Sequence, residues 1–283
     1  MNWKAYYQGK PLIIATKHRK EEVIGPLLHK EFGFQYFASN QIDTDLLGTF
    51  SGEIERNVSH IQAAREKCQM AMEIHGVDVA LSSEGSFGAH PQLMFVPAGT
   101  ELLMFMDRKN EIEISVQVTS TETNFNWKEV KAIHELPPFL EQVKFPSHAL
   151  IIKKSREDFA HMEKGINEAS RLFELVDKFL KSYGSCILET DMRAMNNPTR
   201  MEQIEKLTYQ LMDKMNSLCP HCAFPGFSVM EVQRGLLCSQ CFLPTQSILK
   251  VIYRCQKCFF EQEKPYPSAN YLEDPMYCDY CNP

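Results

Sequence analysis

Apolar residues in the first 217 positions recur with two spacings, which predict alternating strands and helices. Apolar runs such as LIIAT (12–16) and alternating segments such as EIEISVQVTS (111–120) indicate strands, whereas apolar residues three or four positions apart indicate amphipathic helices. The predicted strands are 12–16, 34–38, 77–82, 93–97, 102–106, 111–120, 148–154 and 186–191. The predicted helices are 21–32, 51–75, a short helix that opens at Pro137, 158–182 and 199–217.

Turn and cap signals refine this pattern. The helix 51–75 is predicted to begin after the cap Ser51 and to end at Gly76. The turn Pro-Ala-Gly-Thr (97–100) predicts a hairpin, and SEGSFGAHP (83–91) is expected to be the loop that leaves the strand 77–82. Alternating strands and helices with an antiparallel middle indicate an α/β fold with a mixed sheet and flanking helices.

The composition changes abruptly near Leu218, so we expect an α/β domain over 1–217 and a small domain over 218–283. The second domain holds eight of the ten cysteines, in four Cys-x-x-Cys pairs. Two such pairs complete the tetrahedral shell of one Zn²⁺, so the tail is predicted to be a tandem zinc ribbon with two structural zinc ions. The predicted ligands are Cys219, Cys222, Cys238, Cys241, Cys255, Cys258, Cys278 and Cys281.

The spacers between successive pairs are 15, 13 and 19 residues long, which favours sequential pairing, first with second and third with fourth. An interleaved arrangement, first with third and second with fourth, is the alternative. Either way, each ion has four thiolate ligands and no open position for water, which disfavours hydrolysis at the zinc. The tail aromatics are expected to fill thin ribbon cores, the alternative being stacking on bases. Cys68 and Cys186 are interpreted as buried small hydrophobic residues.

Net charge and hydropathy limit the classes of partner that the chain can bind. The net charge of -6 and pI of about 5.9 argue against a broad nucleic-acid surface, although a local basic patch stays open. The sequence has no run of 18 apolar residues, so it predicts no membrane span. The first ten residues, MNWKAYYQGK, lack the apolar core of a signal peptide. We therefore expect a cytoplasmic protein with reduced cysteines.

Three polar segments follow predicted strands, where ligand sites of open α/β sheets gather. They are 16–20 (TKHRK), 82–88 (SSEGSFG) and 189–200, which runs from Glu189 to Arg200. Candidate phosphate-binding cations and helix-start groups are Lys17, Lys20, Arg193, Thr199 and Arg200. Glu84 and Asp191, with Glu53 or Glu55 as further candidates, have the oxygens that Mg²⁺ or Mn²⁺ prefers.

Each element has a structural alternative. Residues 17–22 can be a solvated turn, Asp191 and Arg193 an ordinary ion pair, and Thr199 a helix cap. The position of His90 before Pro91 favours a structural role for this side chain over a catalytic one.

Two resemblances follow from these motifs. SEGSFGAHP, ETDMRAMNNPTRM (189–201) and the ending CDYCNP resemble a family of uncharacterised bacterial proteins with a tandem zinc-ribbon tail, over nearly the whole chain. That resemblance implies no activity.

The first 212 residues resemble, more weakly, the inosine/xanthosine triphosphate pyrophosphatase superfamily. The two share the order of their elements along the chain. A strand is followed by Ala-Thr and a basic turn, then by a long helix with Arg65, an acidic loop that contains glycine, and a late helix that starts with Thr-Arg. The resemblance implies that Lys20 and Thr199-Arg200 bind nucleotide phosphates and that Glu84 holds Mg²⁺. The chain lacks the usual Asn in its first turn, and that family has no ribbons.

The sequence thus favours metal-dependent hydrolysis or binding of a nucleotide or other phosphorylated small molecule, with Glu84, Asp191 and Lys20 as catalytic candidates. A non-catalytic nucleotide sensor that docks a protein through its ribbons is the alternative. Nucleic-acid binding by the tail is a third hypothesis.

Overall fold

The computed structural model describes residues 2–39, 59–265 and 271–283 and divides into two units between Leu211 and Met212. This division falls inside the last long helix, α6 (Pro198–Asn216), close to the expected boundary after residue 217. None of the helices in the described ranges is long and apolar enough to cross a membrane.

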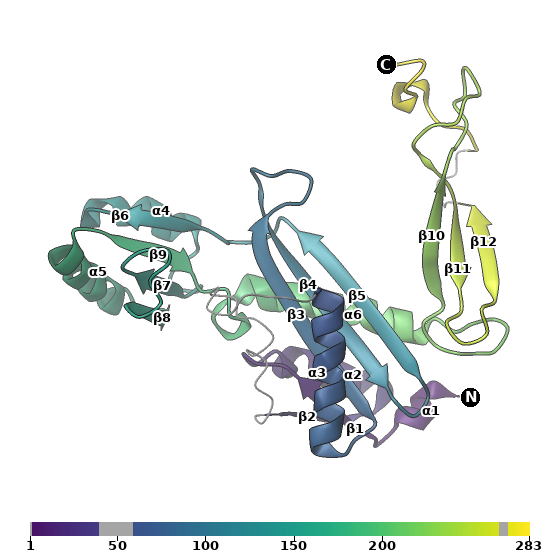
Figure 1. The fold of residues 1–283 in the computed structure, drawn as a ribbon, viewed down its shortest axis with the longest axis horizontal. Coiled ribbons are helices and arrows are strands. Elements are labelled where there is room, and N and C mark those ends of the chain that lie inside the picture. Colours follow the sequence, from purple (N-terminus) through teal and green to yellow (C-terminus); the bar gives the residue numbers. More distant parts are fainter. Residues whose placement is uncertain (1, 40–58, 266–270) are drawn as a thin grey trace. The chain divides into compact units, whose positions relative to one another are not determined.

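A five-stranded mixed sheet, in the order β2-β1-β3-β4-β5, forms the centre of the α/β unit (Figure 1). β1 runs parallel to β2 and β3, whereas β4 and β5 are antiparallel additions. The predicted mixed α/β class is therefore confirmed. The strands are β1 (Pro11–Ala15), β2 (Gln35–Ala38), β3 (Val79–Ala89), β4 (Pro97–Asp107) and β5 (Ile112–Ser120).

The helices α2 (Glu21–Phe32) and α3 (His60–His75) cover opposite faces of this sheet. Met104 of β4 packs in the cluster formed with α3. The next residue, Phe105, points to the other face because side chains alternate along a strand. There its ring contacts Tyr7 of α1 (Trp3–Tyr7), and Tyr7 in turn contacts Phe32 of α2.

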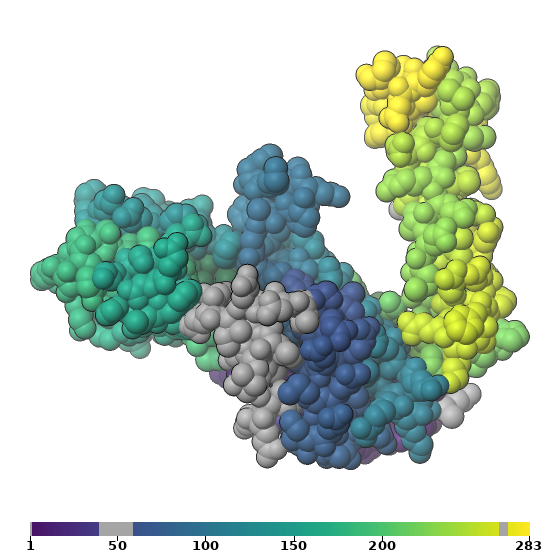
Figure 2. Space-filling view, in the orientation of Figure 1, coloured from purple at the N-terminus to yellow at the C-terminus, as the bar shows by residue number. Residues whose placement is uncertain are grey.

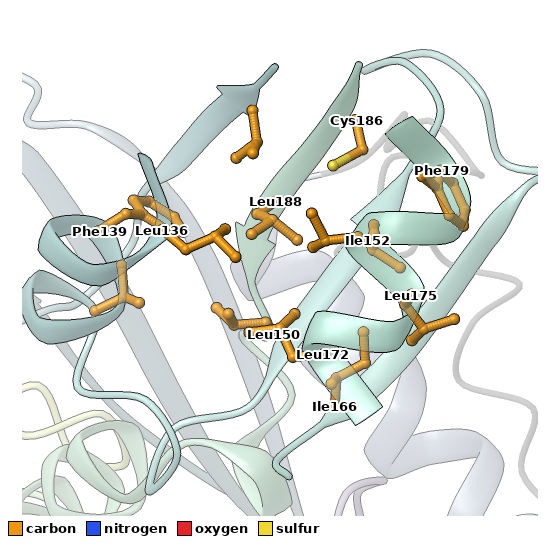
Figure 3. Close-up of a cluster of buried hydrophobic side chains, with 13 residues drawn as sticks. Leu136, Phe139, Leu150, Ile152, Ile166, Leu172, Leu175, Phe179, Cys186 and Leu188 are labelled. Atoms are coloured by element: carbon orange, nitrogen blue, oxygen red, sulfur yellow. The ribbon is translucent and has the colours of Figure 1, made fainter. Parts of the chain in front are cut away.

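A second, antiparallel sheet has the order β6-β9-β7-β8. Its elements are β6 (Trp127–Val130), α4 (Leu136–Gln142), β7 (Leu150–Lys153), β8 (Met162–Ile166), α5 (Ala169–Tyr183) and β9 (Cys186–Thr190), with short 3₁₀ turns at Ile133–Glu135 and Ala194–Asn196. Leu150, Ile152 and Leu188 point from one face of the sheet toward α4 and α5 and form a closed core (Figure 3). The opposite face of this sheet stays outside that core.

The tip of the β3–β4 hairpin differs from the prediction. The expected loop 83–91 is strand up to Ala89, the expected turn 97–100 lies inside β4, and the turn is 90–96, which projects beyond the sheet (Figures 1 and 2). His90 Nδ1 accepts the amides of Gln92 and Leu93 and so fixes the turn. The apolar run 93–97 misled the prediction because Met94 is 81% exposed and packs in no core.

Two helices are shorter than expected. α5 begins at Ala169, because 162–166 form β8. α3 begins at His60, with Ser59 accepting the Gln62 amide, and ends at Gly76 as predicted. The expected cap Ser51 and the candidate ligands Glu53 and Glu55 lie outside the described residues.

The second unit is built on an antiparallel sheet in the order β10-β11-β12. Its strands are β10 (Ser228–Arg234), β11 (Ile248–Arg254) and β12 (Glu261–Pro265), and a 3₁₀ turn follows at Pro275–Tyr277. The cysteine pairs lie before, between and after these strands, which decides how they meet.

Candidate functional site

The eight tail cysteines form two clusters, each of which could hold a metal ion such as zinc. The clusters are Cys219/Cys222/Cys255/Cys258 and Cys238/Cys241/Cys278/Cys281, each with its sulfur atoms within 4.8 Å of one another. The Sγ atoms are 3.6 Å apart in Cys222–Cys255 and Cys241–Cys278, and 3.7 Å apart in Cys219–Cys258. A tetrahedral Zn²⁺ with bonds of about 2.3 Å needs sulfur separations of about 3.8 Å, so the residues fit the ion.

The favoured sequential pairing is therefore wrong, and the interleaved alternative describes the tail. The reason is the antiparallel sheet. A seven-residue strand separates the pair before β10 from the pair after it by about 20 Å. Because β11 runs back, the pair that follows it returns to the beginning of β10, and β12 carries the chain to the other end again.

The cysteine clusters are held by local backbone geometry as well. In three of the pairs the residue after the second cysteine has a left-handed conformation without being glycine, as Ala223, Phe242 and Phe259 show. Each of these residues donates its amide to the carbonyl of the first cysteine. Phe224 and Phe227 are buried in the ribbon, as expected, whereas Phe242 and Phe259 are exposed.

In the α/β unit, a group of ionisable side chains is buried where β1 ends beside β3. Lys20, at the start of α2, is 3% exposed and donates to Ser83 Oγ at 2.9 Å. Burial, followed by the nearby positive charge of Arg200, lowers the pKa of Lys20 to about 7. Glu101 and Glu84 oppose this shift, so both carboxylates act on the Lys20 ammonium.

Arg200, in the first turn of α6, forms a buried ion pair with Glu101 of β4. Its Nε lies 2.5 Å from Glu101 Oε1, its Nη2 lies 3.3 Å from Glu101 Oε2, and its Nη1 donates to the Met192 carbonyl. Both partners are 3% exposed. A Cβ at position 85 would lie 2.5 Å from Arg200 Nη2, so a larger residue there would displace this ion pair.

Glu84 lies on the opposite face of the sheet from Glu101. Gly85 faces Glu101 across the β3–β4 ladder, so Glu84, one residue earlier, projects to the other side. There it forms an ion pair with Lys67 of α3, and both side chains are buried. β1 ends its pairing with β3 at Ser82, so the edge of β3 beyond Ser82 is not covered by β1.

The chain topology explains why these groups meet. From β1 the chain passes through α2 to β2 on one side, and from β3 it turns directly to β4 on the other side. The crevice between the carboxyl ends of two such strands is where open α/β sheets bind ligands. We use the name ionic crevice for this cluster of buried side chains, which comprises Lys20, Lys67, Glu84, Glu101 and Arg200.

The other predicted residues lie outside the ionic crevice. The Asp191 carboxylate follows β9 of the second sheet and accepts from Arg193 and from Asn196 Nδ2. The Thr199 amide donates to His148 Nε2 and the Arg200 amide donates to Asn197 Oδ1, so these two amides at the start of α6 have partners within the protein. Lys17 is half-buried in the turn after β1.

Sequence reasoning missed Lys67 and Glu101. Lys67 is on the buried face of α3, with Ala64, Cys68 and Ala71 as neighbours at helical spacing. Glu101 stands in a strand whose next four residues are apolar and buried. A single charge at a core position of a helix or strand was the signal, because such a charge is stable only with a partner.

The family model named Domain of unknown function (DUF6671) matches residues 67–283. The chain belongs to this family. The match covers both cysteine clusters, Lys67, Glu84, Glu101 and Arg200, whereas Lys20 precedes it. No curated protein matches the chain significantly.

Among solved structures, the crystal structure of protein VC0702 from Vibrio cholerae is similar, with a TM-score of 0.27 and 10% sequence identity. The match covers 40% of this chain and 63% of the length of that protein.

The interleaved clusters predict how paired substitutions change the zinc content. Cys222→Ser with Cys258→Ser removes two ligands from one cluster, so one zinc ion per chain should remain. Cys222→Ser with Cys241→Ser damages both clusters, so neither ion should be held tightly. Native mass spectrometry counts the ions. If the second double variant retains one ion fully, the clusters are sequential.

The lowered pKa of Lys20 predicts that its burial destabilises the folded state by an amount that depends on pH. Between pH 7 and 10.5 the unfolded chain binds this proton and the folded chain does not, so folded-state stability rises with pH in that window. Lys20→Met removes the cost and should increase the free energy of unfolding, on the order of 5 kcal/mol below pH 7. The gain should shrink toward pH 10.

Urea unfolding at several pH values measures this difference, with Lys30→Met, an exposed change on the same helix, as control. A Lys20→Met effect that is constant from pH 6 to 10 would contradict the assigned pKa.

Proposed function

We propose that the α/β unit binds the phosphate groups of a nucleotide or other phosphorylated small molecule in the ionic crevice and hydrolyses it with the help of a divalent cation. The observation that carries this proposal is the burial of three cations and two carboxylates around one strand end. Buried charges are costly, and clusters of them concentrate at functional sites.

The charges of the ionic crevice suit a phosphate ligand. Lys20, Lys67 and Arg200 offset more negative charge than Glu84 and Glu101 supply, provided that Lys20 is protonated. Since the pKa of Lys20 is about 7, an arriving phosphate raises the proton occupancy of its ammonium at neutral pH. Arg200 has a planar fork that matches phosphate oxygens, and Glu101 and Met192 hold this fork in place.

Glu84 is the carboxylate that we assign to a divalent cation. Mg²⁺ is usually held by one or two carboxylates together with phosphate oxygens, and Glu84 at the uncovered part of β3 supplies such a ligand. A bound cation would supply charge neutralisation and a more acidic water molecule. Lys67 then orients the Glu84 carboxylate, while Lys20 and Arg200 hold the phosphate.

This proposal predicts binding and turnover that depend on different residues. Wild-type protein should bind pyrophosphate and a nucleoside triphosphate with Mg²⁺ or Mn²⁺. Lys20→Met should weaken binding at least tenfold, or about 1.4 kcal/mol, because one phosphate partner is lost. Glu84→Gln should retain pyrophosphate binding and lose turnover. Lys30→Met should resemble wild type in both respects.

Calorimetry measures binding, and release of phosphate or pyrophosphate from canonical and deaminated nucleoside triphosphates measures turnover. Binding without turnover by wild type contradicts hydrolysis and favours the sensor alternative. Absence of binding to pyrophosphate and to every nucleotide contradicts the proposal as a whole.

A further inference from the structure

The second sheet has a hollow on the face opposite the core of Figure 3. The alternation along its strands explains this placement. Leu150, Ile152 and Leu188 point into the core, so Ile151, Lys153 and Glu189 point the other way. The β6–β9–β7–β8 ladders place Trp127, Glu189, Ile151 and Lys164 in one row across that face. The hollow has a volume of about 220 Å³.

The lining of the hollow is rich in positive charge. It contains four cationic side chains and two carboxylates, which leaves a net charge of +2 at neutral pH. The cations are Lys153, Arg156, Lys164 and Arg193, and the carboxylates are Glu189 and Asp191. Both carboxylates already bind a cation, since Lys153 Nζ lies 2.7 Å from Glu189 and Arg193 Nη2 lies 2.6 Å from Asp191.

The cations are positioned before any ligand arrives. Lys153 is 3% exposed, although an ammonium is costly to bury. Its Nζ also lies 5.0 Å from the centre of the Phe159 ring. The Arg156 guanidinium lies 4.2 Å from the centre of the Trp127 ring, a cation–π contact that holds it over the sheet.

These contacts also define the chemistry of the ligand. One ring face of Trp127 and one of Phe159 already lie under a cation, so these faces orient charge and are not open for stacking on a base. Pockets for larger ligands measure about 300–1,000 Å³, so a hollow of 220 Å³ suits a smaller molecule than a nucleotide. A net charge of +2 is matched by a doubly charged anion.

We propose that this hollow is a second ligand site, which takes a small dianion, either a phosphate monoester or a dicarboxylate. Arg156 and Lys164 bind the anion, and the pairs Lys153–Glu189 and Arg193–Asp191 form the charged walls. The site is separate from the ionic crevice, because Lys20, Lys67, Glu84, Glu101 and Arg200 do not line it. Asp191 and Arg193, expected in the nucleotide site, belong to this second one.

The test uses the full chain with Lys20→Met, so that the ionic crevice contributes little. Glycerol 3-phosphate, succinate and the monoanion acetate are titrated calorimetrically at constant ionic strength. One of the two dianions should bind at least tenfold more tightly than acetate. The dianion that binds shows whether the natural ligand is a phosphate monoester or a dicarboxylate. If glycerol 3-phosphate binds, its affinity should fall below pH 6, where a phosphate monoester loses its second charge.

Arg156→Gln and Lys164→Gln should each weaken this binding at least fivefold. Lys154→Gln is the matched control, because it removes the same charge next to β7 at a residue that packs over Tyr183 and does not line the hollow. Circular dichroism checks that each variant is folded. The proposal is overturned if neither dianion binds, or if the lining variants bind as tightly as the control.

Discussion

The buried pair of Arg200 and Glu101 is the interaction on which the α/β unit depends most. A guanidinium at 3% exposure is stable only beside a carboxylate, and Glu101 is held at the required place by the β4 ladder. The same guanidinium donates to the carbonyl of Met192, which follows β9 of the second sheet. One side chain therefore links the five-stranded sheet, the start of α6 and the segment after β9. Gly85 leaves space for the Arg200 guanidinium. The positive charge of Arg200 also makes Lys20 easier to deprotonate.

The metal-binding tail obeys a different constraint, which is strand direction. Each strand reverses the chain, so cysteine pairs that are adjacent in sequence lie at opposite ends of the sheet, and alternate pairs meet. Closed four-cysteine shells stabilise a small unit but offer no position for a substrate. The chemistry of the chain is therefore sought in the α/β unit, where two groups of charged side chains differ in composition.

Much of this could be predicted from residue patterns, and the failures have physical causes. The mixed sheet, the Gly76 helix end and the eight cysteine ligands follow from local signals. The cysteine pairing failed because spacer length says nothing about strand direction, and the short strands β10 and β11 were not recognised. Asp191 was grouped with Glu84 because both were expected near the ends of strands, yet Glu84 lies within β3 and Asp191 follows β9 of the other sheet. Lys67 and Glu101 carried no motif, and their burial depends on tertiary packing.

The proposed phosphate site depends on Lys20, a buried amine in the ionic crevice. Lysine side-chain NMR, with the Lys20 signal assigned through Lys20→Met, measures its pKa directly. We expect a pKa of about 7 in the free protein and a clear rise when pyrophosphate is added, since a bound anion favours the ammonium. A Lys20 pKa near 10.5 in the free protein, or one that pyrophosphate leaves unchanged, would show that Lys20 does not bind phosphate in this way.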